Sequence, residues 1–258
     1  MRIDIEGLTI RFRGGVEAVR DVGLSVGSGE LVAVVGPSGC GKSTMLNAIA
    51  GLLPAAEVDI GGTVALDGAD IRRADRRALA LGYVFQRDAL LPWATIAANV
   101  ELGLRIRGVP APERARRVAE LIGIAGLAGF ERYYPHQVSG GMRQRTSLIR
   151  TLAYEPRAIL MDEPFGALDA QNRMILQSEL LRMWERTRTT ILFVTHDLAE
   201  AITLGQRVVA FSKRPGRVTG VFDVPIPGPR DVFEIRGTSE FTRLEREIWS
   251  HLREDFRA

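Results

Sequence analysis

The stretch Gly36-Pro37-Ser38-Gly39-Cys40-Gly41-Lys42-Ser43-Thr44 decides the fold of this chain. It follows an apolar run at residues 31–35 and precedes residues 45–50, whose apolar spacing is helical. A strand, a glycine-rich turn and a helix form the context that a phosphate-binding P-loop requires. The glycines let successive backbone N–H groups point inward around phosphate oxygens, and the helix start adds free donors and the positive end of its dipole.

Two side chains at the end of this stretch have the chemistry that a triphosphate needs. Lys42 supplies a positive charge for the outer phosphates, and the hydroxyl of Ser43 is a ligand for Mg²⁺. The alternative is a glycine-rich turn that binds nothing. The preceding strand, the following helix and the Lys-Ser pair in register disfavour it, so the sequence predicts binding of a nucleoside triphosphate together with Mg²⁺.

Bulk composition is typical of a soluble globular protein. The chain has 258 residues, of which 46% are apolar and 25% charged, and a net charge of +3 does not argue for nucleic acid. A single cysteine allows no intramolecular disulfide and favours a reducing compartment. The beginning of the chain has no signal-peptide core, and the longest apolar stretch, residues 121–130, is too short to span a bilayer. We therefore expect a cytosolic protein that reaches a membrane only through partners.

The order of apolar patterns predicts an α/β fold. Strands are expected at residues 7–12, 19–26, 31–35, 62–66, 81–85, 158–161, 190–195 and 207–212. Helices are expected at residues 96–106, 112–122, 142–153, 171–186, 198–204 and 239–253. Strands that alternate with helices imply a mostly parallel sheet with flanking helices, and the N-terminal strands add an antiparallel part. The all-helical middle indicates an inserted helical subdomain.

These patterns divide the chain into a nucleotide-binding domain and a tail. The domain covers residues 1–230, with its core at 1–86 and 157–230 and the helical subdomain at about 87–156. Residues 225–229, rich in proline, form a loop or an extended linker, and residues 231–258 form a short C-terminal tail with one helix.

A second group of candidate residues follows the apolar strand at 158–161. Asp162 is placed to hold the metal ion, and Glu163 is placed to polarise a water for attack on the γ-phosphate. The alternative is a solvated acidic strand end, which α/β folds often contain. The P-loop upstream favours the catalytic interpretation.

Three further pieces mean little on their own. Ser139, Gly140 and Gly141 stand directly before a helix and form a second anion-binding helix start. Gln86 closes a strand at a point where its amide reaches metal or water, and His196 closes another strand where its imidazole contacts a γ-phosphate.

The order of these motifs resembles the ATP-binding-cassette (ABC) ATPases over roughly residues 1–224. The matching motifs are the P-loop at 36–44, the Q-loop at Gln86, the signature at 138–142, the Walker B strand ending in Glu163, the D-loop at 167–169 and the switch histidine His196. The signature departs from the commonest form at Val138 and Met142, and the methionine variant is known from importer branches, so no loss of activity is implied.

The resemblance implies a homodimer that encloses two ATP molecules head to tail. Ser139, Gly140 and Gly141 would contact the γ-phosphate bound by the partner's Lys42. Asp169 would lie near the dimer axis. Phe12 aligns with the aromatic residue, normally tyrosine, that stacks on adenine; core packing of an edge strand is the alternative for Phe12.

The resemblance extends to a branch of importers. The stretches at 90–100, 164–170 and 213–217 are similar to subunits that serve nitrate, sulfonate and taurine-type importers. In ABC importers a groove between core and helical lobe receives a helix of the permease. The apolar segment Leu90-Leu91-Pro92-Trp93 marks such a contact, unless Leu91 and Trp93 seal the core of the lobe itself.

These points predict the ATP-hydrolysing subunit of an importer for a small anionic or organosulfur or nitrogen-type solute. Its partners would be a second copy of this chain, two permease subunits and, indirectly, an extracytoplasmic solute-binding protein, with no nucleic acid. It would lie peripherally on the cytoplasmic face of the inner membrane. The subunit of an exporter or lipid-extracting complex, and a non-transport ABC ATPase, are the alternatives.

Overall fold

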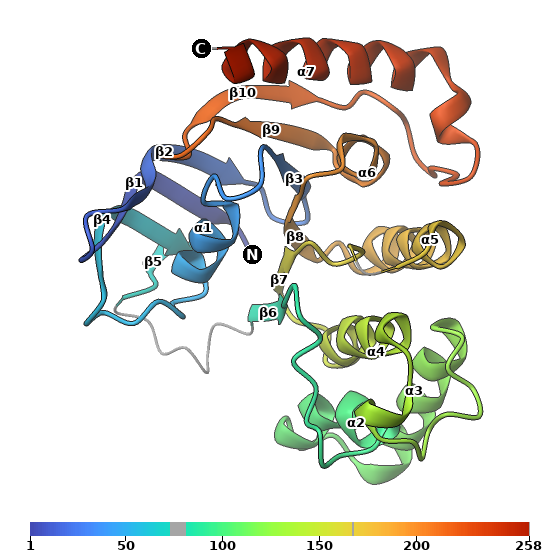
Figure 1. The fold of residues 1–258 in the computed structure, drawn as a ribbon. Helices are drawn as coiled ribbons and strands as arrows, with labels where there is room; N and C mark the ends of the chain where they lie inside the picture. The colour runs from blue at the N-terminus through green and yellow to red at the C-terminus, as the bar shows by residue number, and fades with distance from the viewer. Residues whose placement is uncertain (73–80, 167, 258) are drawn as a thin grey trace.

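The six-stranded sheet at the centre of the molecule confirms the α/β class. The computed structural model describes residues 1–72, 81–166 and 168–257, with side chains as far as residue 253. The strands of this sheet, in spatial order, are β10 (Val218–Asp223), β9 (Arg207–Phe211), β3 (Leu31–Val35), β8 (Thr190–Thr195), β7 (Ala158–Asp162) and β6 (Leu81–Val84). Five of them run parallel, and β10 pairs antiparallel with β9 (Figure 1).

The central strands are continuous apolar runs because both faces of the sheet are covered. Along β3, Leu31, Ala33 and Val35 belong to the core shared with α5 (Ala170–Thr187) and α6 (Leu198–Leu204). Val32 and Val34 point to the opposite core, which contains α1 (Lys42–Ile49). The period-two alternation of side chains thus builds two cores from one strand.

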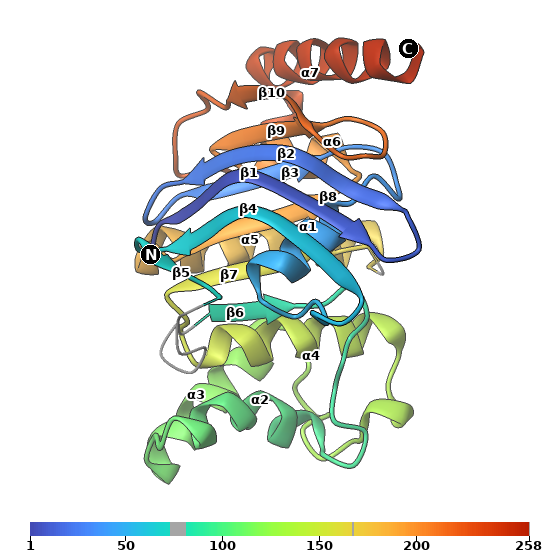
Figure 2. The ribbon, with the colours of Figure 1, turned by 90° about the vertical axis from the view of Figure 1, so that its left-hand side faces the viewer.

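A second sheet lies beyond α1. Its order is β2 (Glu17–Val26), β1 (Ile3–Phe12), β4 (Val58–Leu66) and β5 (Ala69–Asp70), all antiparallel, and it curves around α1 (Figure 2). The strand predicted at 62–66 is shorter than β4, which begins at Val58. The glycines at 61 and 62 interrupt the strand pattern in its first half. Gly62 has φ +80°, and a Cβ there would lie 2.4 Å from the Gly7 carbonyl oxygen, so the bulge opposite β1 requires glycine.

The helical lobe is inserted between β6 and β7, as predicted. It consists of α2 (Ile96–Ile106), α3 (Ala111–Ile124), the short 3₁₀ helix η1 (Pro135–Gln137) and α4 (Gly140–Ala153). The lobe has its own apolar core, which includes Ile96, Val100, Ile122, Leu127 and Ile149. Thr95 and Ser139 cap α2 and α4 with their side-chain oxygens.

The C-terminal residues pack on the central sheet. The 3₁₀ helix η2 (Ile235–Gly237) leads into α7 (Ser239–Arg257), which lies along β10 in Figure 1. Phe241, Leu244, Ile248 and Leu252 are buried in the same core as β3 and β8. The domain boundary at residue 230 stays a prediction. Within the described ranges, no helix combines the length and apolarity needed to cross a bilayer.

Candidate active site

Close backbone contacts explain the glycines of the P-loop. A Cβ at Gly36 would lie 2.7 Å from the carbonyl oxygen of Phe211, and a Cβ at Gly41 would lie 2.4 Å from that of Ala18. Gly41 also has φ +108°, a backbone conformation that residues other than glycine rarely adopt. The loop is therefore shaped by β9 and β2 as well as by its own sequence.

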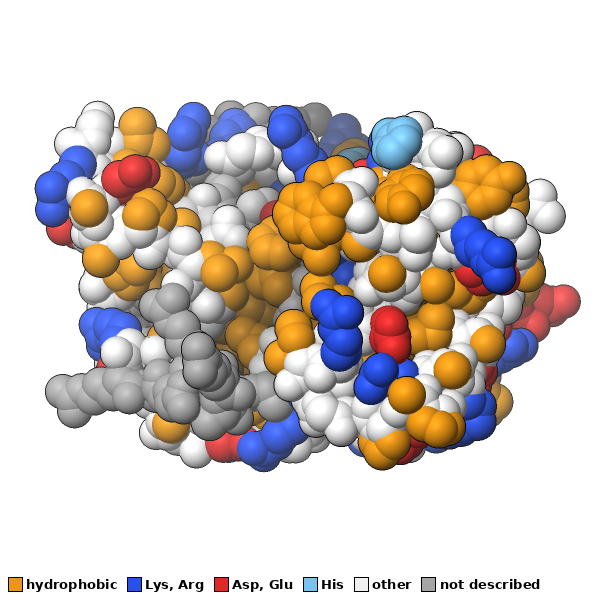
Figure 3. Space-filling view, turned by 90° about the horizontal axis from the view of Figure 1, so that it is seen from below, with side chains coloured by type: hydrophobic (Ala, Val, Ile, Leu, Met, Phe, Trp, Pro, Cys, Tyr) orange, Lys and Arg blue, Asp and Glu red, His pale blue; other side chains and the backbone are white. Residues whose placement is uncertain are grey.

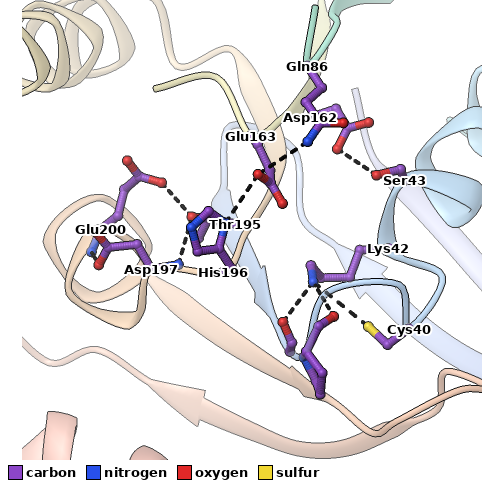
Figure 4. A network of polar contacts seen from close by, with 12 residues as sticks. Cys40, Lys42, Ser43, Gln86, Asp162, Glu163, Thr195, His196, Asp197 and Glu200 are labelled. Atoms are coloured by element: carbon purple, nitrogen blue, oxygen red, sulfur yellow. Dashed lines mark hydrogen bonds and ion pairs between the residues drawn. The ribbon is translucent and has the colours of Figure 1, made fainter. Parts of the chain in front are cut away.

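Lys42 is held over this loop. Its Nζ donates to the carbonyl oxygens of Gly36 at 2.7 Å and Pro37 at 2.8 Å, and the side chain is only 5% exposed (Figure 4). Cys40 Sγ lies 3.8 Å from the same Nζ. Burial raises the pKa of the Cys40 thiol, so this cysteine is a space-filling residue of the loop and a poor nucleophile.

Ser43 and Asp162 bring oxygen ligands together beside the P-loop. Ser43 Oγ donates to Asp162 Oδ1 at 2.8 Å. Burial raises the pKa of Asp162, while the Ser43 hydrogen bond and the charge of Lys42 lower it. A hydroxyl and one carboxylate are the donor set that Mg²⁺ uses when phosphates and waters complete its shell, so these residues fit the ion.

Glu163 lies between the two other predicted catalytic residues. Its Oε2 is 3.1 Å from His196 Nδ1 and 3.4 Å from Gln86 Nε2. The three residues follow β7, β8 and β6, which are neighbours in the sheet, so their strand ends meet at one edge (Figure 4). Glu163 itself has φ +45°, a left-handed backbone conformation that is rare for this residue type and frequent at functional sites.

A buried carboxylate supports the turn that carries His196. Glu200 Oε2 accepts from Thr195 Oγ1 at 2.6 Å, and Glu200 Oε1 accepts from Gln177 Nε2 at 3.1 Å. Thr195 Oγ1 in turn accepts from the backbone N–H of Asp197 at 3.0 Å. Burial raises the pKa of Glu200. This residue was not predicted from the sequence, although an acid within the apolar segment 198–202 is a detectable signal.

Most of the predicted site residues line one cavity of about 330 Å³. It is lined by Phe12, Val16, Ala18, Ser38, Gly39, Gly41, Lys42, Ser43, Thr44, Gln86, Glu163, His196 and Arg214. Phe12 shares this cavity with the P-loop and is also packed, half-buried, against the core. Arg214 was not predicted as a site residue, although residues 213–217 stood out in the sequence for their likeness to importer subunits.

Comparison with known proteins identifies the family. The family model described as ABC transporter matches residues 19–166. The chain belongs to this family. An uncharacterised ABC transporter ATP-binding protein of Methanocaldococcus jannaschii is 43% identical to the cassette over 99% of this chain and 92% of its own length.

Two further relatives are named for import. The taurine import ATP-binding protein TauB of Rhizobium johnstonii is 41% identical over 96% of the cassette and 94% of its own length. The nitrate import ATP-binding protein NrtD of Synechocystis is 38% identical over 97% and 93%. The expected resemblance to the nitrate and taurine branch is thereby confirmed.

Solved structures agree with the fold of the cassette. A dimeric structure of the ABC transporter cassette MJ0796 superposes with a TM-score of 0.77 at 32% identity, covering 87% of this chain and all of that one. A dimeric post-hydrolysis state of MJ0796 bound to ADP and Pi gives a TM-score of 0.76 at 31% identity, with the same coverage.

The signature residues and Asp169 belong to α4 and to the start of α5, which contribute no lining residue to the cavity of the cassette. Ser139, Gly140, Gly141 and Asp169 are not among the described residues that line it. Ser139 and Gly140 are exposed, and Ser139 Oγ accepts from the backbone N–H of Met142 at 3.3 Å. Asp169 caps α5, and hydrogen bonds from Asn172 lower its pKa. Ala167, which opens the predicted D-loop, lies outside the described residues.

The apolar segment after Gln86 divides between core and surface. Leu90 is buried, Leu91 is half-buried, and Trp93 is 74% exposed, so Trp93 does not seal the core of the lobe. A separate groove of about 370 Å³ lies between β6, the end of α2 and α4, and Trp93 does not line it; its lining residues are Leu81, Tyr83, Phe85, Leu102, Gly103, Ile106, Arg107, Arg150, Thr151 and Tyr154. Figure 3 shows a hollow bordered by apolar side chains between the core and the lobe on this side of the cassette.

Proposed function

We propose that this chain is the ATP-hydrolysing subunit of an ABC importer. The observation that carries the proposal is the position of Glu163, which contacts His196 and Gln86 in a cavity that also contains Lys42. The import functions named for the TauB and NrtD relatives support the direction of transport.

Different residues in and beside the cavity bind the different parts of ATP. Phe12 stacks on the adenine ring through its π-face. The backbone N–H groups of residues 36–44 and the ammonium of Lys42 bind the β- and γ-phosphates. Ser43, Asp162 and Gln86 would hold Mg²⁺, which would neutralise negative charge on the outer phosphates.

Glu163 acts as the general base for hydrolysis. It takes a proton from a water molecule while the water oxygen forms a bond to the γ-phosphorus. The bond between that phosphorus and the β–γ bridging oxygen breaks, and ADP leaves with its electron pair. Gln86 orients the attacking water, and His196 contacts the γ-phosphate while its Nδ1 holds the Glu163 carboxylate in place.

The signature residues work on the other subunit of a homodimer. Ser139 and Gly140 are exposed at the start of α4, where the helix dipole and free N–H groups favour an anion. Because they lie away from the cavity of their own chain, they complete the cage around a nucleotide bound by the partner, with Asp169 near the dimer axis. The dimeric form of the MJ0796 cassette supports this arrangement. ATP then holds the dimer closed, and hydrolysis opens it.

Dimer closure is tested with Glu163→Gln, which keeps the nucleotide contacts and removes the base. Light scattering after size exclusion should find a dimer with Mg-ATP and a monomer with Mg-ADP. Glu179→Gln alters a half-buried glutamate on α5 that does not line the cavity, and this control should show the same oligomeric states as the unmodified chain. A Glu163→Gln protein that stays monomeric with Mg-ATP would contradict the proposed closure.

The groove beside β6 and α2 receives a short helix of a permease subunit. Its apolar lining and the exposed indole of Trp93 offer the kind of surface that anchors a partner helix. The chain would therefore lie peripherally on the cytoplasmic face of the inner membrane, bound to two permease subunits. A solute-binding protein on the other side of the membrane would deliver the solute to these subunits.

Permease binding is tested by co-purification in detergent with candidate permease subunits from the same organism. Trp93→Asp should lose the permease. Trp249→Asp, which alters another exposed tryptophan, on α7, should retain it. Equal retention of both variants would exclude Trp93 as a permease contact. Uptake of taurine, other sulfonates and nitrate in cells lacking this chain would then identify the solute.

A further inference from the structure

The hairpin between β9 and β10 is a rigid element. Ser212 closes it from within: the Ser212 hydroxyl donates to the carbonyl oxygens of Lys213 at 2.9 Å and Pro215 at 3.2 Å, and accepts from the backbone N–H of Arg217 at 3.0 Å. The backbone N–H of Ser212 also donates to the Arg217 carbonyl oxygen. A side chain at the tip of this hairpin is therefore presented from a fixed backbone.

The hairpin rests on two elements that border the nucleotide cavity. The Gly216 N–H donates to the Ala18 carbonyl oxygen at 2.9 Å, and the Arg20 N–H donates to the Gly216 carbonyl oxygen at 3.0 Å. A Cβ at Gly216 would lie 2.3 Å from the carbonyl oxygen of Cys40, so only glycine allows this approach to the P-loop. These contacts place the hairpin between β2 and the first half of the P-loop.

Arg214, at the tip of the hairpin, reaches the cavity. Its side chain lines the cavity together with Phe12, Val16 and the P-loop residues Ser38 and Gly39. Arg214 is exposed, and it takes part in none of the ion pairs formed within the described ranges. An unpaired guanidinium at the mouth of a phosphate-binding cavity raises the local positive potential and presents a planar fork of N–H donors that matches phosphate oxygens.

We propose that Arg214 is a further nucleotide-contacting residue, whose guanidinium binds the α-phosphate. Phe12 occupies the base end of the cavity, and Lys42 and Ser43 occupy the end for the outer phosphates. The hairpin contacts Ala18 and Arg20 on β2 and Cys40 of the P-loop, so the part of the cavity that it borders would take the ribose and the α-phosphate. This assignment rests on the proposed function, because it requires ATP in this cavity.

The test measures equilibrium dissociation constants of ATP and ADP by competition with a fluorescent nucleotide. Arg214→Ala should weaken both ligands by the same factor, about fivefold, because the α-phosphate is common to both. The dissociation constants of Arg214→Lys should lie between those of Arg214→Ala and of the unmodified chain, since lysine keeps the positive charge but lacks the planar pair of N–H donors. Arg217→Ala removes an exposed arginine of the same hairpin that does not line the cavity, and should leave both constants unchanged.

The outcomes separate this inference from the proposed function. Unchanged constants in Arg214→Ala, or a loss confined to ATP, would overturn the assignment to the α-phosphate. If the unmodified chain bound neither nucleotide, the proposed function itself would fail. Melting curves of the three variants should coincide with that of the unmodified chain, because both arginines are exposed, and a shifted curve for Arg214→Ala would count against a purely ligand-binding role.

Discussion

Arg143 Nε donates to Asp88 Oδ2 at 2.7 Å, and this ion pair joins the start of α4 to the segment that follows Gln86. Arg143 Nη1 also donates to the Val138 carbonyl oxygen at 3.0 Å, directly before the signature serine. Two turns further along the same helix face, Arg150 Nη1 donates to the Ala89 carbonyl oxygen at 2.9 Å. The two motifs are thus tied together within one chain, so a shift of the Q-loop displaces the start of α4.

A double-mutant cycle measures this connection. Asp88→Ala, Arg143→Ala and the double variant should give a coupling of about 0.5–1 kcal/mol in the free energy of unfolding, because both side chains are about one-third exposed. The more exposed i,i+4 pair Arg116–Glu120 is the control and should couple by about 0.3 kcal/mol. Strict additivity at Asp88 and Arg143 would show that the pair does not link the two motifs.

Loss of the general base should separate turnover from binding. In Glu163→Gln we expect the rate of phosphate release to fall by about 10²–10⁴-fold, because the amide cannot accept the proton from water. The dissociation constant of ATP should change by less than about twofold, since the P-loop and Lys42 are untouched. Steady-state phosphate release and equilibrium binding check the two halves, and unchanged turnover would exclude Glu163 as the base.

Mixing two inactive variants should restore hydrolysis if the signature acts on the partner. Lys42→Ala destroys the P-loop side of a site, and Ser139→Glu destroys the signature side. In a mixed dimer one site carries both lesions and the other carries neither. An equimolar mixture should therefore regain about a quarter of the normal rate, because half the dimers are mixed and each has one intact site. No recovery on mixing would mean that each chain uses its own signature.

The buried carboxylate beneath His196 makes stability depend on pH. Burial raises the pKa of Glu200 above its ordinary value of 4.5, so the folded state binds this proton more tightly than the unfolded state. Stability from this group is therefore present below pH 4.5 and is lost as the pH rises through the raised pKa. Glu200→Gln removes the ionisation, so the melting temperature of Glu200→Gln relative to the unmodified chain should increase with pH across this window. A difference that stays constant from about pH 5 to about pH 8 would contradict the prediction.

Asn99 should be essential for the loop that carries Trp93. It is fully buried; its Oδ1 accepts from the Leu91 N–H at 2.8 Å, and its Nδ2 contacts the carbonyl oxygens of Leu91, Ala94 and Thr95. Asn99→Ala leaves these groups without partners and should lower the free energy of unfolding by about 2–4 kcal/mol. Thr95→Ala, which removes only the cap of α2, should cost about 1 kcal/mol. Denaturant titration compares the two, and equal costs would reject the role given to Asn99.

The prediction was closest for a strand buried on both faces and failed for the edge strand β10. The strand at 190–195 was predicted with its observed bounds because all six residues are buried, so that four apolar residues stand between two β-branched threonines. The strand β10 was missed because it lies at the sheet edge, where half-buried and exposed residues follow no clear alternation. Arg214 was missed as a site residue for a related reason: its place depends on where a hairpin docks, and no local pattern records that.

The sequence alone determined that a P-loop is present, which strands end in polar residues, and which family the chain belongs to, because these properties reside in local spacing and order. The tertiary structure alone decided that Glu163, His196 and Gln86 meet at one carboxylate, that Arg214 enters the nucleotide cavity, and that Ser139 lies away from it. Strand order in the sheet sets such distances, and strand order follows from the packing of both cores at once, which no single segment encodes.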